Sequence, residues 1–273
     1  MATQRPLPQL RLLLTSASLA VLCSLAPIGV SAQTDTSNAP FSYQLSEDGH
    51  LLKLDGPSGA VAAETLITGT PDRVQLSEDG QWLAMTTRQP AALTIYATAD
   101  LSVGHHLPLN DKRGEPVAGA ALGLSTSRDS FVLALSDRPE LWEVFYGPNP
   151  PQFGFAHDWR IEGPVDQPTA FPVRKITLRA ALIDLILDPS GEYVLGDTGN
   201  SSIRVTDLVI GQQVAQHDLP SGTSVTGLRL SASEGGVLVT LSGPGPAGLL
   251  FSTKDLSKPQ PLSHKDLLTR EAR

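Results

Sequence analysis

An all-β fold made of repeated units is predicted by three observations. First, a short apolar strand, a polar turn with an acidic residue or glycine, and a second apolar strand recur five times in that order. Second, the copies are 31, 48, 63 and 43 residues apart, measured between Leu45, Leu76, Leu124, Leu187 and Leu230. Third, glycine and proline number 24 and 22, which suits many turns. Because blades of about 40–45 residues are typical of propellers, we expect a β-propeller of four-stranded antiparallel blades, with about five blades recognisable and four to seven possible.

The repeat predicts the order of strands within each blade. The five copies of the first strand pair are residues 43–52, 74–83, 122–133, 185–195 and 228–238. A third strand follows in three units, at residues 93–96, 203–205 and 249–251, and residues 213–219 alternate as a fourth strand. The short first interval indicates that the N-terminal unit lacks a strand or donates one to close the ring. A smaller ring, or closure through a second copy of the chain, remains open.

The N-terminus has the pattern of a secretory signal peptide. Arg5 and Arg11 precede an apolar run over residues 12–30, and Val30-Ser31-Ala32 provides a site of small residues for cleavage. We therefore expect a signal peptide over residues 1–32, a linker over 33–40 and a periplasmic or secreted protein. The alternative is an uncleaved membrane anchor, although Ser, Thr and Pro interrupt the run. The single cysteine, Cys23, would leave with the leader.

Charge disfavours one class of partner. Removing the two leader arginines leaves 18 basic against 28 acidic residues, a balance of −10. Nucleic acid binding needs a basic surface that neutralises phosphates, so we expect no nucleic acid partner. We also expect no membrane span after cleavage of the leader.

The expected domain boundaries follow from the repeat. The propeller is assigned to residues 41–262 and a C-terminal tail to 263–273, which we expect to be frayed or to form a loose helical turn. The third interval carries about twenty extra residues, assigned to an insert over 147–171. Prolines at 148, 150, 151, 164 and 168 prevent continuous strand pairing there.

Residues 130–219 go beyond a generic blade. The segments Ser130–Val144, Phe171–Ile176, Ile183–Asp188, Tyr193–Gly196 and Ile203–Asp207 resemble the haem-d1 propeller family, which includes the haem-d1 domain of cytochrome cd1 nitrite reductases and periplasmic relatives in haem-d1 assembly. The resemblance implies a tetrapyrrole ligand, haem d1. The family's reductases carry distal histidines where this chain has Ile183 and Ser221-Gly222-Thr223, and no Cys-x-x-Cys-His motif is present. The chain therefore lacks the imidazoles needed for general-acid work, which disfavours a self-sufficient reductase.

The insert is the predicted ligand-binding segment. Phe155 and Trp159 could cover a flat conjugated ligand, while Arg160 and Arg174 could meet its carboxylates. His157 could then be an axial ligand of the haem iron. The alternative is structural, with the aromatic residues fixing a proline-rich loop to the blade and His157 exposed.

Asp184 is the remaining candidate, because it precedes a first strand at the funnel end of the propeller. His105 and His106 are expected in an exposed turn; neighbouring residues on a strand point to opposite faces, so they would not chelate one metal together.

Two functions from different classes follow. The first is an exported propeller that binds haem d1, or helps to assemble it for nitrite respiration, without catalysis. The second is an interaction scaffold with YVTN-like or WD-like blades, which would hold periplasmic proteins and no cofactor. Metal-centred hydrolysis or lactone chemistry comes last, because only Asp184 is an obvious ligand.

Overall fold

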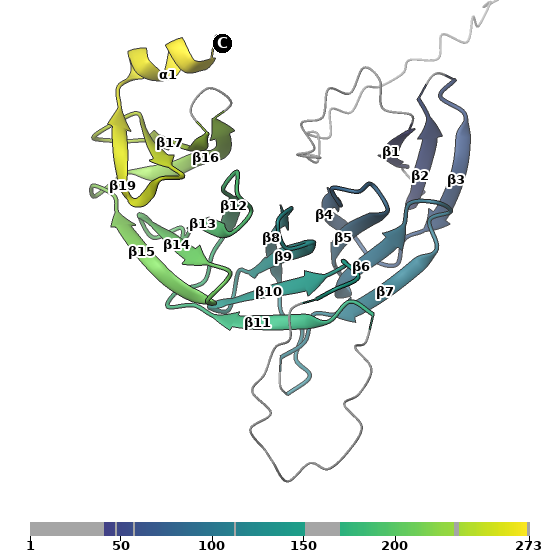
Figure 1. Cartoon of the computed structure of the whole chain (residues 1–273). Coiled ribbons are helices and arrows are strands. Elements are labelled where there is room, and N and C mark those ends of the chain that lie inside the picture. The colour runs from purple at the N-terminus through teal and green to yellow at the C-terminus, as the bar shows by residue number, and fades with distance from the viewer. Residues whose placement is uncertain are drawn as a thin grey trace, which may run out of the picture.

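The structure is a computed structural model that describes residues 41–46, 48–56, 58–111, 113–150, 170–231 and 235–271, with side chains described up to residue 267. These residues form nineteen strands and one helix. The strands make five antiparallel sheets, which we call blades 1 to 5 and which follow one another around an open arc (Figure 1). The predicted all-β propeller architecture with about five blades is confirmed.

Within each blade the strands run in chain order from the inner to the outer edge. Blade 1 contains β1 (Phe41–Leu45), β2 (His50–Asp55) and β3 (Val61–Leu66), and blade 2 contains β4 (Pro71–Leu76), β5 (Trp82–Arg88), β6 (Ala91–Ala97) and β7 (Val103–Pro108). Blade 3 contains β8 (Gly119–Ser125), β9 (Ser130–Leu135), β10 (Glu140–Phe145) and β11 (Val173–Thr177). Blade 4 contains β12 (Asp184–Leu187), β13 (Tyr193–Asp197), β14 (Ser202–Asp207) and β15 (Gln212–Asp218). Blade 5 contains β16 (Ser224–Ser231), β17 (Gly236–Ser242), β18 (Gly248–Ser252) and β19 (Asp255–Leu262).

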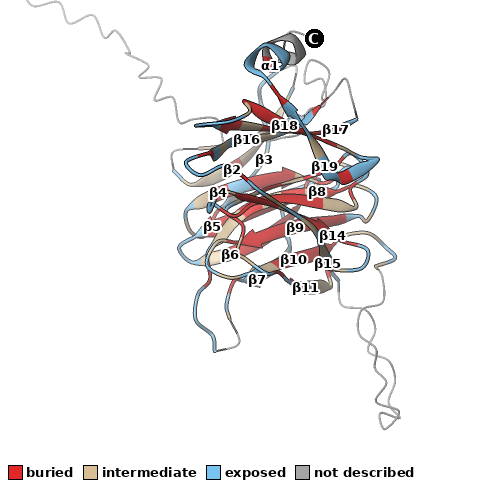
Figure 2. Cartoon of the chain, turned by 90° about the vertical axis from the view of Figure 1, so that its left-hand side faces the viewer, coloured by how far each residue is buried: buried red, intermediate tan, exposed pale blue. Residues whose placement is uncertain are grey.

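Burial follows the position of a strand in its blade. All six residues of β9 are buried, because a central strand is packed on both faces. The outer strand β15 alternates between exposed and half-buried residues along its length. Figure 2 shows the same trend across the molecule, with buried residues concentrated in the middle strands.

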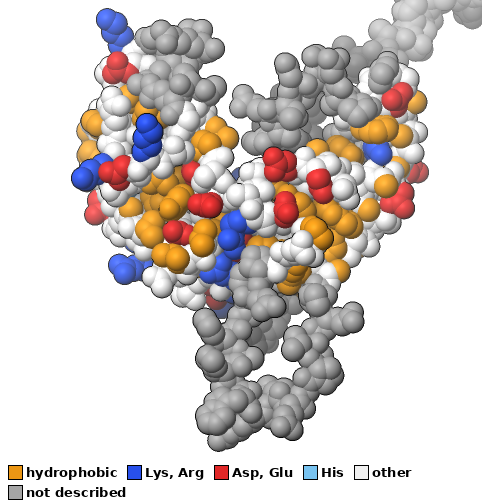
Figure 3. Space-filling view, in the orientation of Figure 1, with side chains coloured by type: hydrophobic (Ala, Val, Ile, Leu, Met, Phe, Trp, Pro, Cys, Tyr) orange, Lys and Arg blue, Asp and Glu red, His pale blue; other side chains and the backbone are white. Residues whose placement is uncertain are grey.

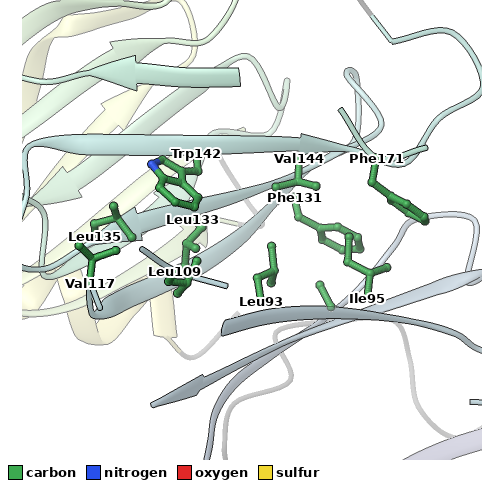
Figure 4. Close-up of a cluster of buried hydrophobic side chains, with 11 residues drawn as sticks. Leu93, Ile95, Leu109, Val117, Phe131, Leu133, Leu135, Trp142, Val144 and Phe171 are labelled. Atoms are coloured by element: carbon green, nitrogen blue, oxygen red, sulfur yellow. The ribbon is translucent and has the colours of Figure 1, made fainter. Parts of the chain in front are cut away.

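The core lies in the seams between neighbouring blades. Between blades 2 and 3, Leu93 and Ile95 of β6 pack with Phe131 of β9 and Val144 of β10 (Figure 4). Similar apolar clusters fill the seams between blades 1 and 2, 3 and 4, and 4 and 5. Inner strands approach closely enough to require small residues: a Cβ on Gly123 of β8 would meet Leu187 of β12 at 2.5 Å.

In the described residues blade 1 has three strands where the other blades have four, in line with the short first interval, and a recurring contact identifies which position is not filled. In blade 2, the residue after the outer strand is the buried Leu109, whose backbone N–H donates to the carbonyl of Ala91 at the start of the third strand (2.9 Å). Leu178 and Leu219 make the matching contact in blades 3 and 4.

In blade 1 this position is taken by Ile67, whose N–H donates to Gly49 just before β2 (2.9 Å). Therefore β2 and β3 are the third and outer strands, β1 is the second, and the innermost strand is absent from the described residues. The prediction that residues 43–52 are a first strand pair is wrong. The Ser-Glu-Asp-Gly turn before His50 joins second and third strands, whereas the same tetrapeptide before Gln81 joins first and second strands.

The C-terminal tail forms a helix, α1 (His264–Glu271), rather than a frayed end. Its start is a reciprocal cap: Ser263 Oγ accepts the backbone N–H of Asp266 (3.3 Å), and the Asp266 carboxylate accepts the N–H of Ser263 (2.9 Å). Leu267 packs with Leu238, Ala247, Leu250 and Leu262. The helix therefore covers the face of blade 5 that is turned away from blade 4.

The insert lies between β10 and β11, where the third interval places it, and residues 151–169 fall outside the described residues. Its returning end is held by Phe171, whose ring lies edge-on to Trp82 (4.9 Å between centroids) and stacks on His105 (5.4 Å). His105 and His106 lie on strand β7 and not in a turn, which corrects the prediction. They do point to different partners, since His106 Nδ1 contacts Thr94 Oγ1 at 2.9 Å.

Candidate ligand-binding cleft

A cleft of about 480 Å³ lies where the inner strands of blades 2 to 4 begin. This end of the propeller is called the cleft face. It is built by turns from three blades, and the residues around the cleft are Asp72, Arg88, Gln89, Ala118, Gly119, Ala120, Ser136 and Ile183. The volume is in the range of small-molecule sites, and Ala118, Gly119 and Ala120 at the start of β8 contribute only small side chains to the lining.

Charges of both signs gather at the cleft face. Arg88, with a side chain that is 68% exposed, donates to the buried carboxylate of Asp72 (2.5 Å). Arg73 follows Asp72 on β4 and is exposed. Figure 3 views the opposite end of the propeller, where acidic and basic side chains also lie together near the middle of the arc. The cleft can therefore offer guanidinium groups to an anionic ligand while aspartates hold them in place.

Asp184 begins β12 at the cleft face, next to Ile183, which lines the cleft; its predicted role in binding stays a prediction. It is the register partner of Asp197 on β13. Burial raises the pKa of Asp184, an effect that the charge of Arg73 opposes, and burial together with the nearby Asp184 raises the pKa of Asp197. Each carboxylate accepts one backbone N–H, from Leu185 (2.9 Å) and Gly199 (2.8 Å) respectively. The two groups form a carboxylate pair with increased affinity for protons.

Arg174 lies at the other end of blade 3, close to the ends of the insert. Its guanidinium donates to the carbonyl of Leu208 in blade 4 (2.5 Å) and lies 3.5 Å from the carboxylate of Glu143. Glu143 is fully buried and also pairs with Arg128. These contacts give Arg174 a structural role between blades 3 and 4. Its predicted role in ligand binding stays a prediction.

The described structure does not bring the six predicted residues together. Phe155, His157, Trp159 and Arg160 lie outside the described residues. The insert leaves and re-enters blade 3 at the ends of β10 and β11 that are opposite the cleft face, because Glu140 pairs with Thr177 at the cleft end. Asp184 and Arg174 are therefore at opposite ends of the propeller.

Sequence reasoning missed Asp72, Arg73, Arg88 and Asp197. A signal was available, because each lies at the start of an inner strand or at the end of a second strand, the two places that converge on one end of a propeller. Without the strand order inside each blade, that signal could not be used.

The described histidines provide no ligand at this site. None of them lines the cleft, and among the residues that the structure describes no group of three or more His, Cys, Asp or Glu is placed to hold a metal ion. His157 as an axial ligand is untested by these contacts. No helix within the described ranges is long and apolar enough to cross a membrane.

The blades and the cleft at one end of the inner strands define a β-propeller with a candidate small-molecule site. The sequence model of the Cytochrome D1 heme domain family matches residues 15–156, just over half of the 273 residues. The chain therefore belongs to the cytochrome d1 haem-domain family, as the resemblance in blades 3 and 4 indicates.

Individual relatives agree with this assignment. The dihydro-haem d1 dehydrogenase of Pseudomonas aeruginosa is 31% identical over 109 residues, which are 40% of this chain and 22% of that protein. The structure of dihydro-haem d1 dehydrogenase NirN in complex with DHE superposes with a TM-score of 0.60 at 21% identity, covering 82% of this chain and 44% of the other. The β-propeller domain of Cps50 (Swd1) from Myceliophteria thermophila gives 0.57 at 15% identity, covering 81% and 67%. These two structures show the fold alone, and the chain spans less than half of the two dehydrogenase chains.

Proposed function

We propose that this protein binds a tetrapyrrole of the haem-d1 type at the cleft face and serves as a periplasmic binding or assembly accessory without catalysing a reaction itself. Family membership supports the ligand class. A dihydro-haem d1 dehydrogenase is among its relatives, and the solved structure of NirN is a complex with DHE.

The observation that carries the proposal is the pairing of two arginines with a small-residue wall. Tetrapyrroles are flat and carry carboxylates, which arginine binds through short, charge-assisted hydrogen bonds. Arg73 lies near the start of β4 and Arg88 at the end of β5. Arg88 lines the cleft together with Ala118-Gly119-Ala120 of blade 3. The iron of a haem would bring redox chemistry. His157, predicted as its axial ligand, belongs to the insert, which joins blade 3 at the end opposite the cleft face, so binding at the cleft does not depend on it.

Absorption spectroscopy tests the proposal. Titration of the purified protein with haem d1 should give a saturable shift of the visible absorption bands. The same titration with haem b measures the selectivity for haem d1. Loss of one charge-assisted hydrogen bond costs about 1.5–3 kcal/mol, so Arg73→Ala and Arg88→Ala should each weaken binding about tenfold or more.

Arg204→Ala is the matched control, because Arg204 binds Gln213 and Gln216 on the outer part of blade 4. It should leave the affinity unchanged. No spectral change with either haem would refute tetrapyrrole binding and favour the scaffold function. If His157→Ala leaves the spectrum of the haem complex unchanged, His157 is not the axial ligand. That result would not contradict binding at the cleft.

A further inference from the structure

Two aspartates face each other at the cleft end of blade 4. Asp184, the first residue of β12, is the register partner of Asp197, the last residue of β13. Register partners in an antiparallel pair project to the same face of the sheet with Cβ atoms about 4.5–5.5 Å apart, and like charges in this arrangement are destabilising. Asp197 is only 6% exposed and Asp184 is half-buried. Water therefore screens the repulsion between the two carboxylates poorly.

Neither aspartate has a basic side chain against it. In the described part of the chain, the ion pairs involve other acidic residues. Each carboxylate accepts a single backbone N–H, from Leu185 or Gly199, so the second oxygen of each is left without a donor. A proton held between the carboxylates would remove the repulsion and supply a donor. Burial raises the pKa of both groups, which agrees with this arrangement.

The pair belongs to the cleft and not to the outer surface of the blade. Ile183, immediately before Asp184, lines the cleft and is 48% exposed. Strand β8 contacts both β4 and β12, so Arg73 of β4 and Asp184 of β12 lie on the two sides of the small residues that begin β8. The charge of Arg73 opposes the effect of burial on the pKa of Asp184, which means that the two groups interact across the cleft face.

The elements around the pair carry few other charges. These charged residues are Asp72 on β4, Arg88 on β5, Arg179 in the loop before β12 and Arg229 on β16. Asp72 and Arg88 pair with each other, and β8 has no charged residue. Arg229 is opposite Leu238, towards the far end of β16 from the cleft face. Arg73 is the basic group whose charge acts on Asp184.

An anionic group bound at Arg73 would make the pair hold its proton more tightly. A ligand carboxylate on this guanidinium neutralises the charge that opposes protonation of Asp184, and it brings a further negative charge close to the pair. By thermodynamic linkage, protonation of the pair then strengthens binding of the ligand by the same factor. A protonated carboxyl can also donate a hydrogen bond to the ligand, which an ionised carboxylate cannot.

We propose that the cleft takes up an anionic ligand together with one proton, which Asp184 and Asp197 hold between them. The proposal rests on the proposed function for the class of ligand, since a tetrapyrrole supplies the carboxylate. The arginines would hold the charge of the ligand, whereas the aspartates would make its affinity depend on pH.

Infrared spectroscopy of the ligand-free, full-length protein tests the pair by itself. The C=O band of a protonated carboxyl group should persist to higher pH than the band of an ordinary aspartic acid. Asp184→Asn and Asp197→Asn should each remove this band or move its titration to lower pH, because each removes one member of the pair. Arg73→Ala should move the titration to higher pH. A band that is absent, or that any one of these three substitutions leaves unchanged, would overturn the proposal.

Binding of haem d1 as a function of pH tests the coupling. The affinity of wild type relative to Asp184→Asn should increase as the pH falls, by up to about tenfold for each pH unit, the limit for one proton. Asn resembles the protonated carboxyl in shape and takes up no proton. The control is Asp218→Asn, at an exposed position of the outer strand β15, which should keep the pH dependence of wild type.

The outcomes separate this proposal from the proposed function. If haem d1 binds with the same pH dependence to wild type and to Asp184→Asn, the coupling is overturned and the proposed function stands. If haem d1 does not bind at any pH, the proposed function and the coupling are both refuted, and the infrared band still reports whether the two aspartates hold a proton.

Discussion

Glu143 is a fully buried glutamate in the middle of β10. Arg128 Nε lies 2.5 Å from its carboxylate, Ser130 Oγ donates to it (3.1 Å), and Arg174 approaches it from β11. Breaking such a pair is costly, because the remaining charge stays buried without its partner. The network explains why a charged residue is tolerated between two apolar seams.

Replacing Glu143 by Gln should destabilise the protein by about 3–5 kcal/mol, since Arg128 would keep its charge without the carboxylate. Urea unfolding followed by circular dichroism measures the change. The exposed Lys254, in the turn between β18 and β19, is the control, and Lys254→Ala should change the free energy of unfolding by no more than about 0.5 kcal/mol. Equal losses for the two variants would contradict this account.

Asp184 makes stability depend on pH. Because burial raises its pKa above the ordinary 3.8, the folded chain holds this proton more tightly than the unfolded chain. The free energy of unfolding therefore falls as pH rises from about 3.8 through the raised pKa, and stays lower above it.

Asp184→Asn should remove this loss, so the variant should melt a few degrees higher than wild type at neutral pH and equal to it at acid pH. Melting temperatures across the pH range measure the effect. Asn at the exposed Asp137, in the turn between β9 and β10, should change neither value. A variant less stable than wild type at neutral pH would show that the carboxylate is held by a favourable charge instead.

At the scale of elements, α1 is the clearest departure from expectation. The eight residues from His264 carry only two adjacent leucines, Leu267 and Leu268, and so few apolar residues predict no packed helix. The helix is stabilised by its packing on the outward face of blade 5. This tertiary contact cannot be read from the local sequence pattern.

Leu267→Ala should therefore destabilise the protein by about 2–3 kcal/mol, because it removes packing from Leu238, Leu250 and Leu262. Thermal unfolding gives the value, and binding of a fluorescent apolar dye should increase. His264→Ala, at an exposed position of the same helix, should have little effect. If the two variants behave alike, α1 does not seal blade 5.

The strand repeat predicted most of the fold, and the reasons for its errors are physical. Ser-Glu-Asp-Gly suits any tight reversal between antiparallel strands, so two identical turns concealed a shift of one strand in blade 1. The contact of Arg174 with Glu143 could not be predicted, because the two residues are opposite each other only through the register of β10 and β11; whether Arg174 also binds a ligand stays a prediction. The position of Asp184 at the start of an inner strand could be predicted, because such a start can be recognised within a single repeat. The cleft arginines, in contrast, become neighbours of blade 3 only after the blades assemble.

At the scale of the whole molecule, the arc has two ends, and a closed ring has none. Blades 2, 3 and 4 are held from both sides, while blades 1 and 5 each have one neighbouring blade. Arrays in which each unit contacts only its neighbours open most readily from their ends.

Native-state hydrogen exchange should therefore be slowest in β9 and β10 of blade 3, where burial is nearly complete, and become faster through blades 2 and 4 towards blades 1 and 5. Uniform protection across all the blades would mean that they unfold as one cooperative unit. The cleft, built from blades 2 to 4, lies in the part of this gradient that opens last, so partial opening at either end of the chain can exchange protons with solvent while a bound ligand stays in place.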